Sequence, residues 1–148
     1  MRRILQEVDL HDIQLILEVT ERSLLSTSGR ILERIRELKQ LGIQMSMDDF
    51  GMGHSSMMYL QENAFDEVKL DGSLVRQILE NERSRDIVRG ITRLAASMQF
   101  HVVAEFVETR EQMELLKALH CDIYQGYYYG KPCSCDEFII KYLKQEPR

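Results

Sequence analysis

Tryptophan is absent from this sequence of 148 residues, proline occurs only twice, and cysteine only three times. No apolar run approaches the roughly 20 residues of a transmembrane helix, so we expect no membrane segment. The basic start Met1-Arg2-Arg3 is not followed by the apolar stretch of a signal peptide. Cys121, Cys133 and Cys135 lack the paired spacing of a zinc site. We therefore expect reduced thiols in a cytoplasmic protein.

An excess of positive charge is also lacking. The sequence has 19 Lys and Arg against 24 Asp and Glu, which gives a net charge of −5. Binding to nucleic-acid phosphates needs clustered Lys and Arg, so we expect no nucleic-acid partner. With 44% hydrophobic and 29% charged residues, the composition is ordinary for a globular protein. The length predicts one domain over residues 1–148.

Short apolar segments alternate with amphipathic segments along the chain. Apolar residues at helical spacing predict helices that include Ile31–Leu41, Arg83–Met98, Met113–Leu119 and Phe138–Leu143. Between them, the strands expected are Leu15–Val19, Ile43–Met47, Val68–Leu70, Val102–Ala104 and Ile123–Tyr124. Strands that alternate with helices in this way favour an α/β fold with a parallel sheet.

Polar residues recur where these apolar strands end. They are acids, a lysine and an amide, namely Glu18, Asp48, Asp49, Lys69, Asp71, Glu105 and Gln125. In a (β/α)₈ barrel, the carboxyl ends of all strands share one face, so groups placed there converge. The pattern predicts one shared, acidic site.

Clustered carboxylates with little His or Cys favour Mg²⁺ or Mn²⁺ over zinc. A pair of such ions is a common device for phosphodiester hydrolysis, and a nearby lysine can orient the attacking water or neutralise charge. Simpler interpretations stay open at this point. Asp48-Asp49 also suits an Asx turn, Lys69 an edge-strand lysine, and Glu21 and Glu108 the first turn of a helix.

Five motifs, in order, resemble those of one protein family. They are Glu18-Val19-Thr20-Glu21, Asp48-Asp49-Phe50-Gly51-Met52-Gly53-His54-Ser55-Ser56, Val68-Lys69-Leu70-Asp71, Val103-Ala104-Glu105-Phe106-Val107-Glu108-Thr109 and Gln125-Gly126-Tyr127-Tyr128. Together they resemble the EAL family of cyclic-di-GMP phosphodiesterases. The resemblance implies a (β/α)₈ barrel that hydrolyses cyclic di-GMP to the linear dinucleotide with two Mg²⁺ or Mn²⁺ ions.

The resemblance also implies roles for individual residues. Glu18, Asp48 and Asp49 would be metal ligands, Lys69 and Glu105 catalytic residues at the attacking water, and Asp71 and Gln125 substrate contacts. Glu21 would anchor the glycine-containing loop Phe50–Ser56. Cyclic di-GMP would be the ligand, with a regulatory domain or protein as a further partner.

The chain also departs from the family pattern. It matches the C-terminal portion, about five βα units, and lacks the N-terminal strand that carries the Glu-Ala-Leu motif. Phe106 stands where the family usually has glycine, and Met52 and His54 are also unusual. An open barrel edge favours self-association. Because metal ligands are missing, the alternative is a catalytically inactive module that binds cyclic di-GMP or a protein.

Overall fold

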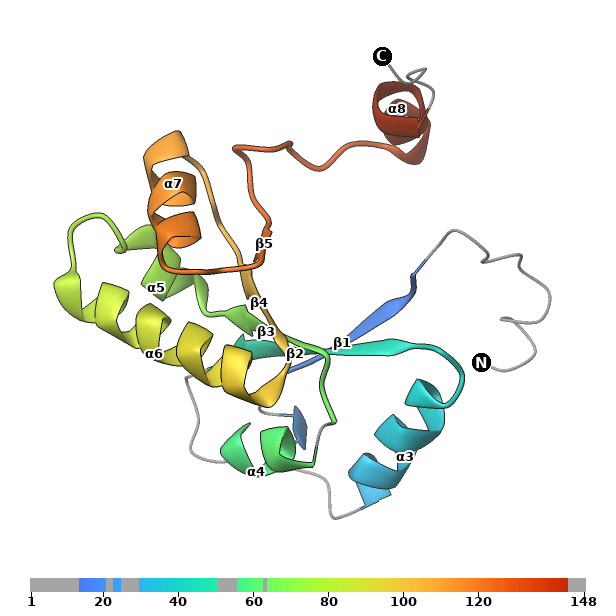
Figure 1. Ribbon diagram of the computed structural model, residues 1–148. Coiled ribbons are helices and arrows are strands. Elements are labelled where there is room, and N and C mark those ends of the chain that lie inside the picture. The colour runs from blue at the N-terminus through green and yellow to red at the C-terminus, as the bar shows by residue number, and fades with distance from the viewer. Residues whose placement is uncertain (1–13, 21–22, 25–29, 51–55, 63, 144–148) are drawn as a thin grey trace.

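The computed structural model describes residues 14–20, 23–24, 30–50, 56–62 and 64–143. Within this part of the chain, five parallel strands form one sheet in the order β1-β2-β3-β4-β5 (Figure 1). The strands are β1 (Ile16–Thr20), β2 (Gln44–Phe50), β3 (Glu67–Leu70), β4 (His101–Ala104) and β5 (Ile123–Tyr124). The predicted strands and their parallel pairing are therefore confirmed.

Helices connect each strand to the next. They are α3 (Arg30–Lys39), α4 (Ser56–Gln61), α5 (Gly72–Arg76), α6 (Glu82–Met98) and α7 (Arg110–Ala118), followed by α8 (Cys135–Phe138) and a π-helical turn η1 (Ile139–Leu143). Figure 1 shows α8 at the end of an extended arm, away from the sheet. No helix in the described ranges is long and apolar enough to span a membrane.

Local sequence sets where these helices begin and end. Gly42, at φ 80°, follows α3 and turns the chain into β2, as a glycine after a helix allows. Asn81 caps α6 by accepting hydrogen bonds from the backbone N–H groups of Arg83 and Ser84. Thr109 and Gln112 form a capping box at the start of α7. These signals are local, which is why the elements could be predicted from the sequence.

The sheet has two unlike faces because side chains alternate along each strand. One face is apolar and buried, and it packs with residues of α3, α6 and α7 in a single core. Its strand residues include Met45, Met47, Val68, Leu70, Val102 and Ala104. The register pairs Met47 with Val68 and Val68 with Val102, so the apolar residues of neighbouring strands lie side by side. This face holds the sheet and helices together.

The opposite face carries polar residues. Glu18 on β1 pairs with Ser46 on β2, and Ser46 pairs with Glu67 on β3, so their side chains project to the same side. Two residues further along, Thr20 pairs with Asp48. This polar face carries the predicted site residues of the strands.

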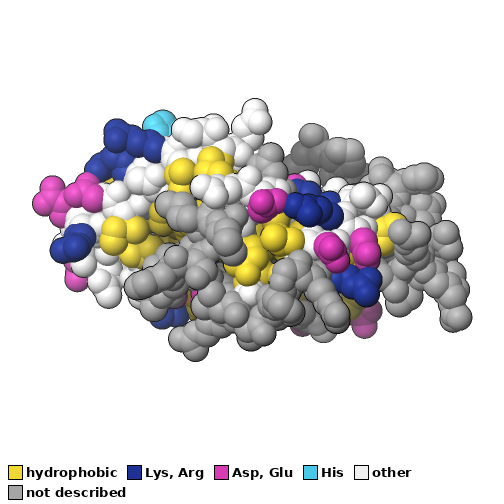
Figure 2. All heavy atoms as spheres, turned by 90° about the horizontal axis from the view of Figure 1, so that it is seen from below, with side chains coloured by type: hydrophobic (Ala, Val, Ile, Leu, Met, Phe, Trp, Pro, Cys, Tyr) yellow, Lys and Arg dark blue, Asp and Glu magenta, His cyan; other side chains and the backbone are white. Residues whose placement is uncertain are grey.

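One side of the molecule carries side chains of mixed character among the described residues (Figure 2). The view in Figure 2 shows acidic, basic and hydrophobic side chains mixed over the described residues, with no extended basic patch among them on that side.

All three cysteines are free thiols, and burial raises the pKa of Cys121 to about 12. Cys121 is therefore an inert core thiol.

Candidate functional site

Lys69 lies at the centre of the polar face. It stands on the middle strand, β3, and its side chain is only 5% exposed. Its Nζ donates to Oε1 of Glu18 on β1 at 2.9 Å and lies 2.7 Å from Oε1 of Glu105, just after β4. Lys69 thus contacts two other residues predicted to share its site, one on β1 and one just after β4.

The two carboxylates determine the charge of Lys69. Burial alone would lower the pKa of this lysine, but hydrogen bonds to Glu105 and Glu18 outweigh that effect. The pKa is therefore raised above the ordinary value of 10.5, and Lys69 is a cation at neutral pH. A lysine that stays protonated at neutral pH can donate hydrogen bonds and neutralise negative charge, but it cannot accept a proton there.

Asp48 and Asp49 lie at an irregularity of β2. The register with β3 shifts between Met47 and Phe50, so the two acids stand where one residue would normally fit. Asp49 adopts a left-handed conformation, φ 58°, which Asp tolerates better than most residues. The carboxylate of Asp48 accepts a hydrogen bond from the backbone N–H of Asp49 at 2.9 Å. The irregularity places two consecutive acids at the carboxyl end of β2.

These acids suit a hard divalent cation in chemical type, because carboxylate oxygens are the ligands that Mg²⁺, Mn²⁺ and Ca²⁺ take. Glu18 and Asp48 lie on neighbouring strands and on the same face. In the conformation described here, no group of three His, Cys, Asp or Glu side chains within the described ranges is assembled to hold a metal ion. Glu18 contacts Lys69 through its Oε1 atom.

Glu105 and Gln125 are held side by side by hydrogen bonds that continue beyond the ends of β4 and β5. The backbone N–H of Gln125 donates to the carbonyl of Ala104 at 2.9 Å, and that of Val107 donates to the carbonyl of Gln125 at 3.1 Å. Gln112 accepts from the N–H of Glu108 and, through its Nε2, reaches the carbonyl of Val75 at 3.4 Å. The segment after β4 is therefore fixed to both β5 and α5.

Asp71 occupies the N-cap of α5, where its carboxylate accepts hydrogen bonds from the backbone N–H of Ser73 at 2.9 Å and from the Ser73 hydroxyl. The cap stabilises the helix start. It places Asp71 next to the end of β3, close in sequence to Lys69. Its role in substrate binding stays a prediction.

Some predicted features lie outside the described residues. Glu21, Met52 and His54 are among them, as is the loop Phe50–Ser56 apart from its two end residues. The proposed anchoring of that loop by Glu21 therefore stays a prediction.

The structure adds residues that the motifs did not identify. Ser46 is buried on the polar face, and its hydroxyl has no hydrogen-bond partner within the described part of the chain. Glu67, two residues before Lys69, is also buried there. Strand alternation could have found both, because they lie two positions from Asp48 and Lys69. Arg76 had no such signal, since its side chain meets the site only in the folded chain.

A hollow of about 240 Å³ opens beside Glu105. It is lined by Arg76, Glu105, Phe106, Glu108, Gln125, Gly126 and Tyr127. Phe106 is 44% exposed and has a left-handed backbone, φ 55°. For a bulky side chain this conformation costs roughly 1–2 kcal/mol. The guanidinium carbon of Arg76 lies 4.1 Å from the centre of the Phe106 ring.

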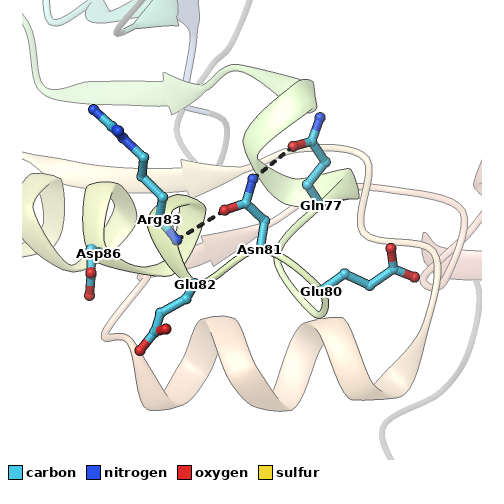
Figure 3. A pocket seen from close by; sticks show the side chains of 6 residues that line it. All are labelled: Gln77, Glu80, Asn81, Glu82, Arg83 and Asp86. Carbon is cyan, nitrogen blue, oxygen red and sulfur yellow. Dashed lines mark hydrogen bonds between the residues drawn. The ribbon is translucent and has the colours of Figure 1, made fainter.

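Two other hollows contain fewer site residues. One, of about 680 Å³, surrounds the start of α6 (Figure 3), where Asn81 lies between Gln77 and Arg83 and hydrogen-bonds to both. It includes no predicted site residue. The other, of about 770 Å³, has an aromatic lining that includes Tyr124, Tyr129, Phe138 and Tyr142. It shares Gln125, Gly126 and Tyr127 with the hollow beside Glu105, and Gln125 is the one predicted site residue in its lining.

Known proteins resemble this chain in both sequence and fold. The cyclic di-GMP phosphodiesterase NbdA of Pseudomonas aeruginosa is 34% identical over 145 residues, which is 96% of this chain and 18% of NbdA. The structure of the PaMucR phosphodiesterase in complex with c-di-GMP is 34% identical, with a TM-score of 0.77 over 84% of this chain and 50% of that one. The manganese/cy-diGMP complex of Klebsiella pneumoniae BlrP1 is 27% identical, with a TM-score of 0.78 over 89% of this chain and 34% of that one.

The chain thus spans about half of the PaMucR chain and less than a fifth of NbdA. Its five strands and their helices match part of a barrel-type domain in these structures. The sequence also matches the EAL domain over residues 1–132, which is most of its length. The chain therefore belongs to the EAL domain family.

Proposed function

We propose that this chain carries the catalytic portion of a cyclic-di-GMP phosphodiesterase, which hydrolyses cyclic di-GMP to the linear dinucleotide pGpG. The observation that supports it most is the position of Lys69 between Glu18 and Glu105 on the polar face of the sheet. Relatives with the same domain are named as cyclic di-GMP phosphodiesterases. The arrangement places the ammonium group of Lys69 and several carboxylates together near the carboxyl ends of the strands.

In this proposal Lys69 orients the attacking water. Its ammonium group has three donors, and two of them are directed to Glu18 and Glu105. The third can hold a water oxygen or a phosphate oxygen. Because its pKa is raised, Lys69 neutralises the negative charge that develops on the phosphate. Glu105 can accept the proton of the water, since its carboxylate lies beside the ammonium group of Lys69 that would hold this water.

Glu18, Asp48 and Asp49 would hold Mg²⁺ or Mn²⁺, and Asp71 and Gln125 would contact the nucleotide. A pair of such cations, when bound, lowers the pKa of a coordinated water and stabilises the leaving oxygen. The manganese and calcium complexes named for BlrP1 support a divalent cation of this type. Glu18 is shared between this role and Lys69, so we expect weaker cation binding than in a site with dedicated ligands.

Incubation of the chain with cyclic di-GMP and Mn²⁺, followed by separation of the nucleotides, tests the proposal. We expect linear dinucleotide with the native chain, and loss of at least about 100-fold in rate for Lys69→Met. Chelation of the cation should abolish turnover. Leu79→Ala, at an exposed position on the linker between α5 and α6, is the matched control and should retain the native rate. Turnover that persists in Lys69→Met would contradict the proposed role.

One observation favours a second function. Glu18, one of the proposed cation ligands, is paired with Lys69, and a cation site weakened in this way suits a module that binds cyclic di-GMP without cleaving it. Calorimetric titration with cyclic di-GMP in Ca²⁺ separates the two functions. Binding without turnover in Mn²⁺ would establish the second.

We also propose that the chain self-associates through the edges of its sheet. In the described sheet, β1 and the two-residue β5 each pair with only one strand. Unpaired strand edges favour association with another chain. Sedimentation equilibrium should give a mass above that of the 17.4 kDa chain. A strictly monomeric chain across the concentration range would refute this proposal.

A further inference from the structure

We propose that Phe106, supported by Arg76, is a stacking platform for one base of the nucleotide and sets how tightly that base is held. The inference rests on the proposed function for the class of ligand. Its own support is the geometry of the segment after β4.

The size of the hollow suits one base. At about 240 Å³ it is smaller than the 300–1,000 Å³ of pockets that enclose a whole drug-sized ligand. A cyclic dinucleotide would therefore place only part of itself there. Glu105 lines this hollow and also contacts Lys69, so a base bound against Phe106 would have its phosphate near the reacting groups.

The conformation of Phe106 differs from that of a packing residue. The next residue, Val107, is fully buried, whereas Phe106 stays 44% exposed in a left-handed backbone conformation. A phenyl ring on a strained backbone is usually buried, because the free energy gained by burying the ring offsets the strain. Here the ring instead borders a hollow, and strained residues in such positions are typical of ligand sites.

Two neighbours fix the ring before any ligand arrives. The guanidinium of Arg76 lies over one face of the ring, 4.1 Å from its centre. Gly72 leaves room for the ring, because a Cβ at that position would lie within 2.4 Å of Phe106 Cδ2. A ring held in this way loses little freedom on binding, which favours affinity.

The side chains of the hollow match the two parts of a nucleotide. Aromatic rings stack on nucleobases regardless of base identity, and Tyr127 supplies a second ring in the same hollow. Arg76 supplies a positive charge that suits a phosphate, and it lines the same hollow as the carboxylates of Glu105 and Glu108. The combination of ring and guanidinium indicates a nucleotide better than it indicates an uncharged aromatic or a simple anion.

Calorimetric titration of the full chain with cyclic di-GMP in Ca²⁺ tests the inference. Stacking of one base on an aromatic side chain changes binding by about 5- to 150-fold, so we expect a loss in this range for Phe106→Leu. Phe138→Leu is the matched control, because Phe138 is 47% exposed and lies outside this hollow. It should bind as the native chain does.

A second variant separates binding from folding. Phe106→Gly removes both the ring and the backbone strain, so its thermal unfolding should occur at or near the native temperature while its binding falls as in Phe106→Leu. Intermolecular NOEs between the purine H8 proton and phenylalanine ring protons should be present in the native chain and absent in Phe106→Leu. A purely structural Phe106 would give no such contact.

The outcomes also separate the inference from the proposed function. Native binding without turnover would contradict the proposed hydrolysis and leave the inference supported if Phe106→Leu binds more weakly. Binding of Phe106→Leu within twofold of the native chain would overturn the inference and leave hydrolysis standing. A native chain that does not bind cyclic di-GMP would overturn both.

Discussion

The two faces of the sheet are built from the same strands but have different chemistry. Met45, Met47, Val68 and Leu70 face the helices and are almost completely buried. On the opposite face, the same strands β2 and β3 carry Ser46, Asp48, Glu67 and Lys69. Alternation along a strand therefore lets one segment serve both the core and the site.

The comparison implies that the two faces contribute differently to the free energy of folding. Each large apolar side chain on the helix-facing side contributes about 1.5–3 kcal/mol by burial. On the polar face, the contacts of Lys69 with Glu18 and Glu105 must first offset the cost of burying a charge. We expect substitutions on the first face to change stability, and those on the second to change activity more than stability.

The largest effect on stability should come from the apolar face. Leu70→Ala removes a fully buried side chain from β3 and should lower the free energy of unfolding by about 2–5 kcal/mol. Leu79→Ala changes the same residue type at an exposed position and should cost less than about 0.5 kcal/mol. Urea unfolding followed by circular dichroism measures both. Equal losses in the two variants would contradict this difference.

A pair of glycines extends the comparison to the backbone. A Cβ at Gly126 would lie 2.2 Å from the carbonyl oxygen of Val107, so Gly126→Ala should destabilise the chain by about 1–3 kcal/mol. Gly90, in the middle of α6, has open space around it, and Gly90→Ala should stabilise by about 0.5–1 kcal/mol. Thermal unfolding should shift in opposite directions. A shift in the same direction for both would mean that the close approach after β5 is not rigid.

Lys69 tests the polar face through a double-mutant cycle. Lys69→Met leaves Glu105, which is 17% exposed, without its cation, and should lower the free energy of unfolding by about 1–2 kcal/mol. Glu105→Gln should also be destabilising, and the double variant should lose less than the sum of the two. Chemical denaturation of all four proteins gives the coupling. Additive losses would show that the pair does not interact.

The smallest effect is the dependence of stability on alkaline pH. Because the pKa of Lys69 is raised on folding, its protonated form contributes stability that is fully present below the ordinary pKa of 10.5. That contribution is lost as the pH rises through the raised folded-state value. The difference in unfolding free energy between the native chain and Lys69→Met should therefore shrink above about pH 10.5. A difference that grows with pH would reverse the assigned sign.

The order of elements was predictable because its signals are local. The apolar runs that became β3 and β4, the glycine after α3 and the spacing along α6 each act within a few residues. Polar residues at the strand ends were expected to converge, and the structure brings Glu18, Lys69 and Glu105 together from three strands. The roles that the family resemblance implies for them stay predictions.

Other features depend on tertiary packing, and no local sequence pattern predicts them. Phe106 was expected only as a departure beside Glu105. Its contact with Arg76 arises because α5 and the segment after β4 are adjacent in the fold, and its left-handed backbone is seen only in the folded chain. The shift of register at Asp48-Asp49 likewise depends on how β2 pairs with β3. Such contacts join residues that are distant in sequence, so no local pattern predicts them.

Mapping bound cyclic di-GMP by NMR tests most directly that the polar face is the site. With Ca²⁺ present, the largest amide shift changes should occur at Lys69, Glu105, Phe106 and Gln125, where β3, β4 and β5 end. Residues Gln77–Asp86 around the start of α6, and the aromatic residues of the C-terminal arm beyond Tyr129, should change little. Shift changes centred on either of those two regions would contradict the assignment of the site to the polar face.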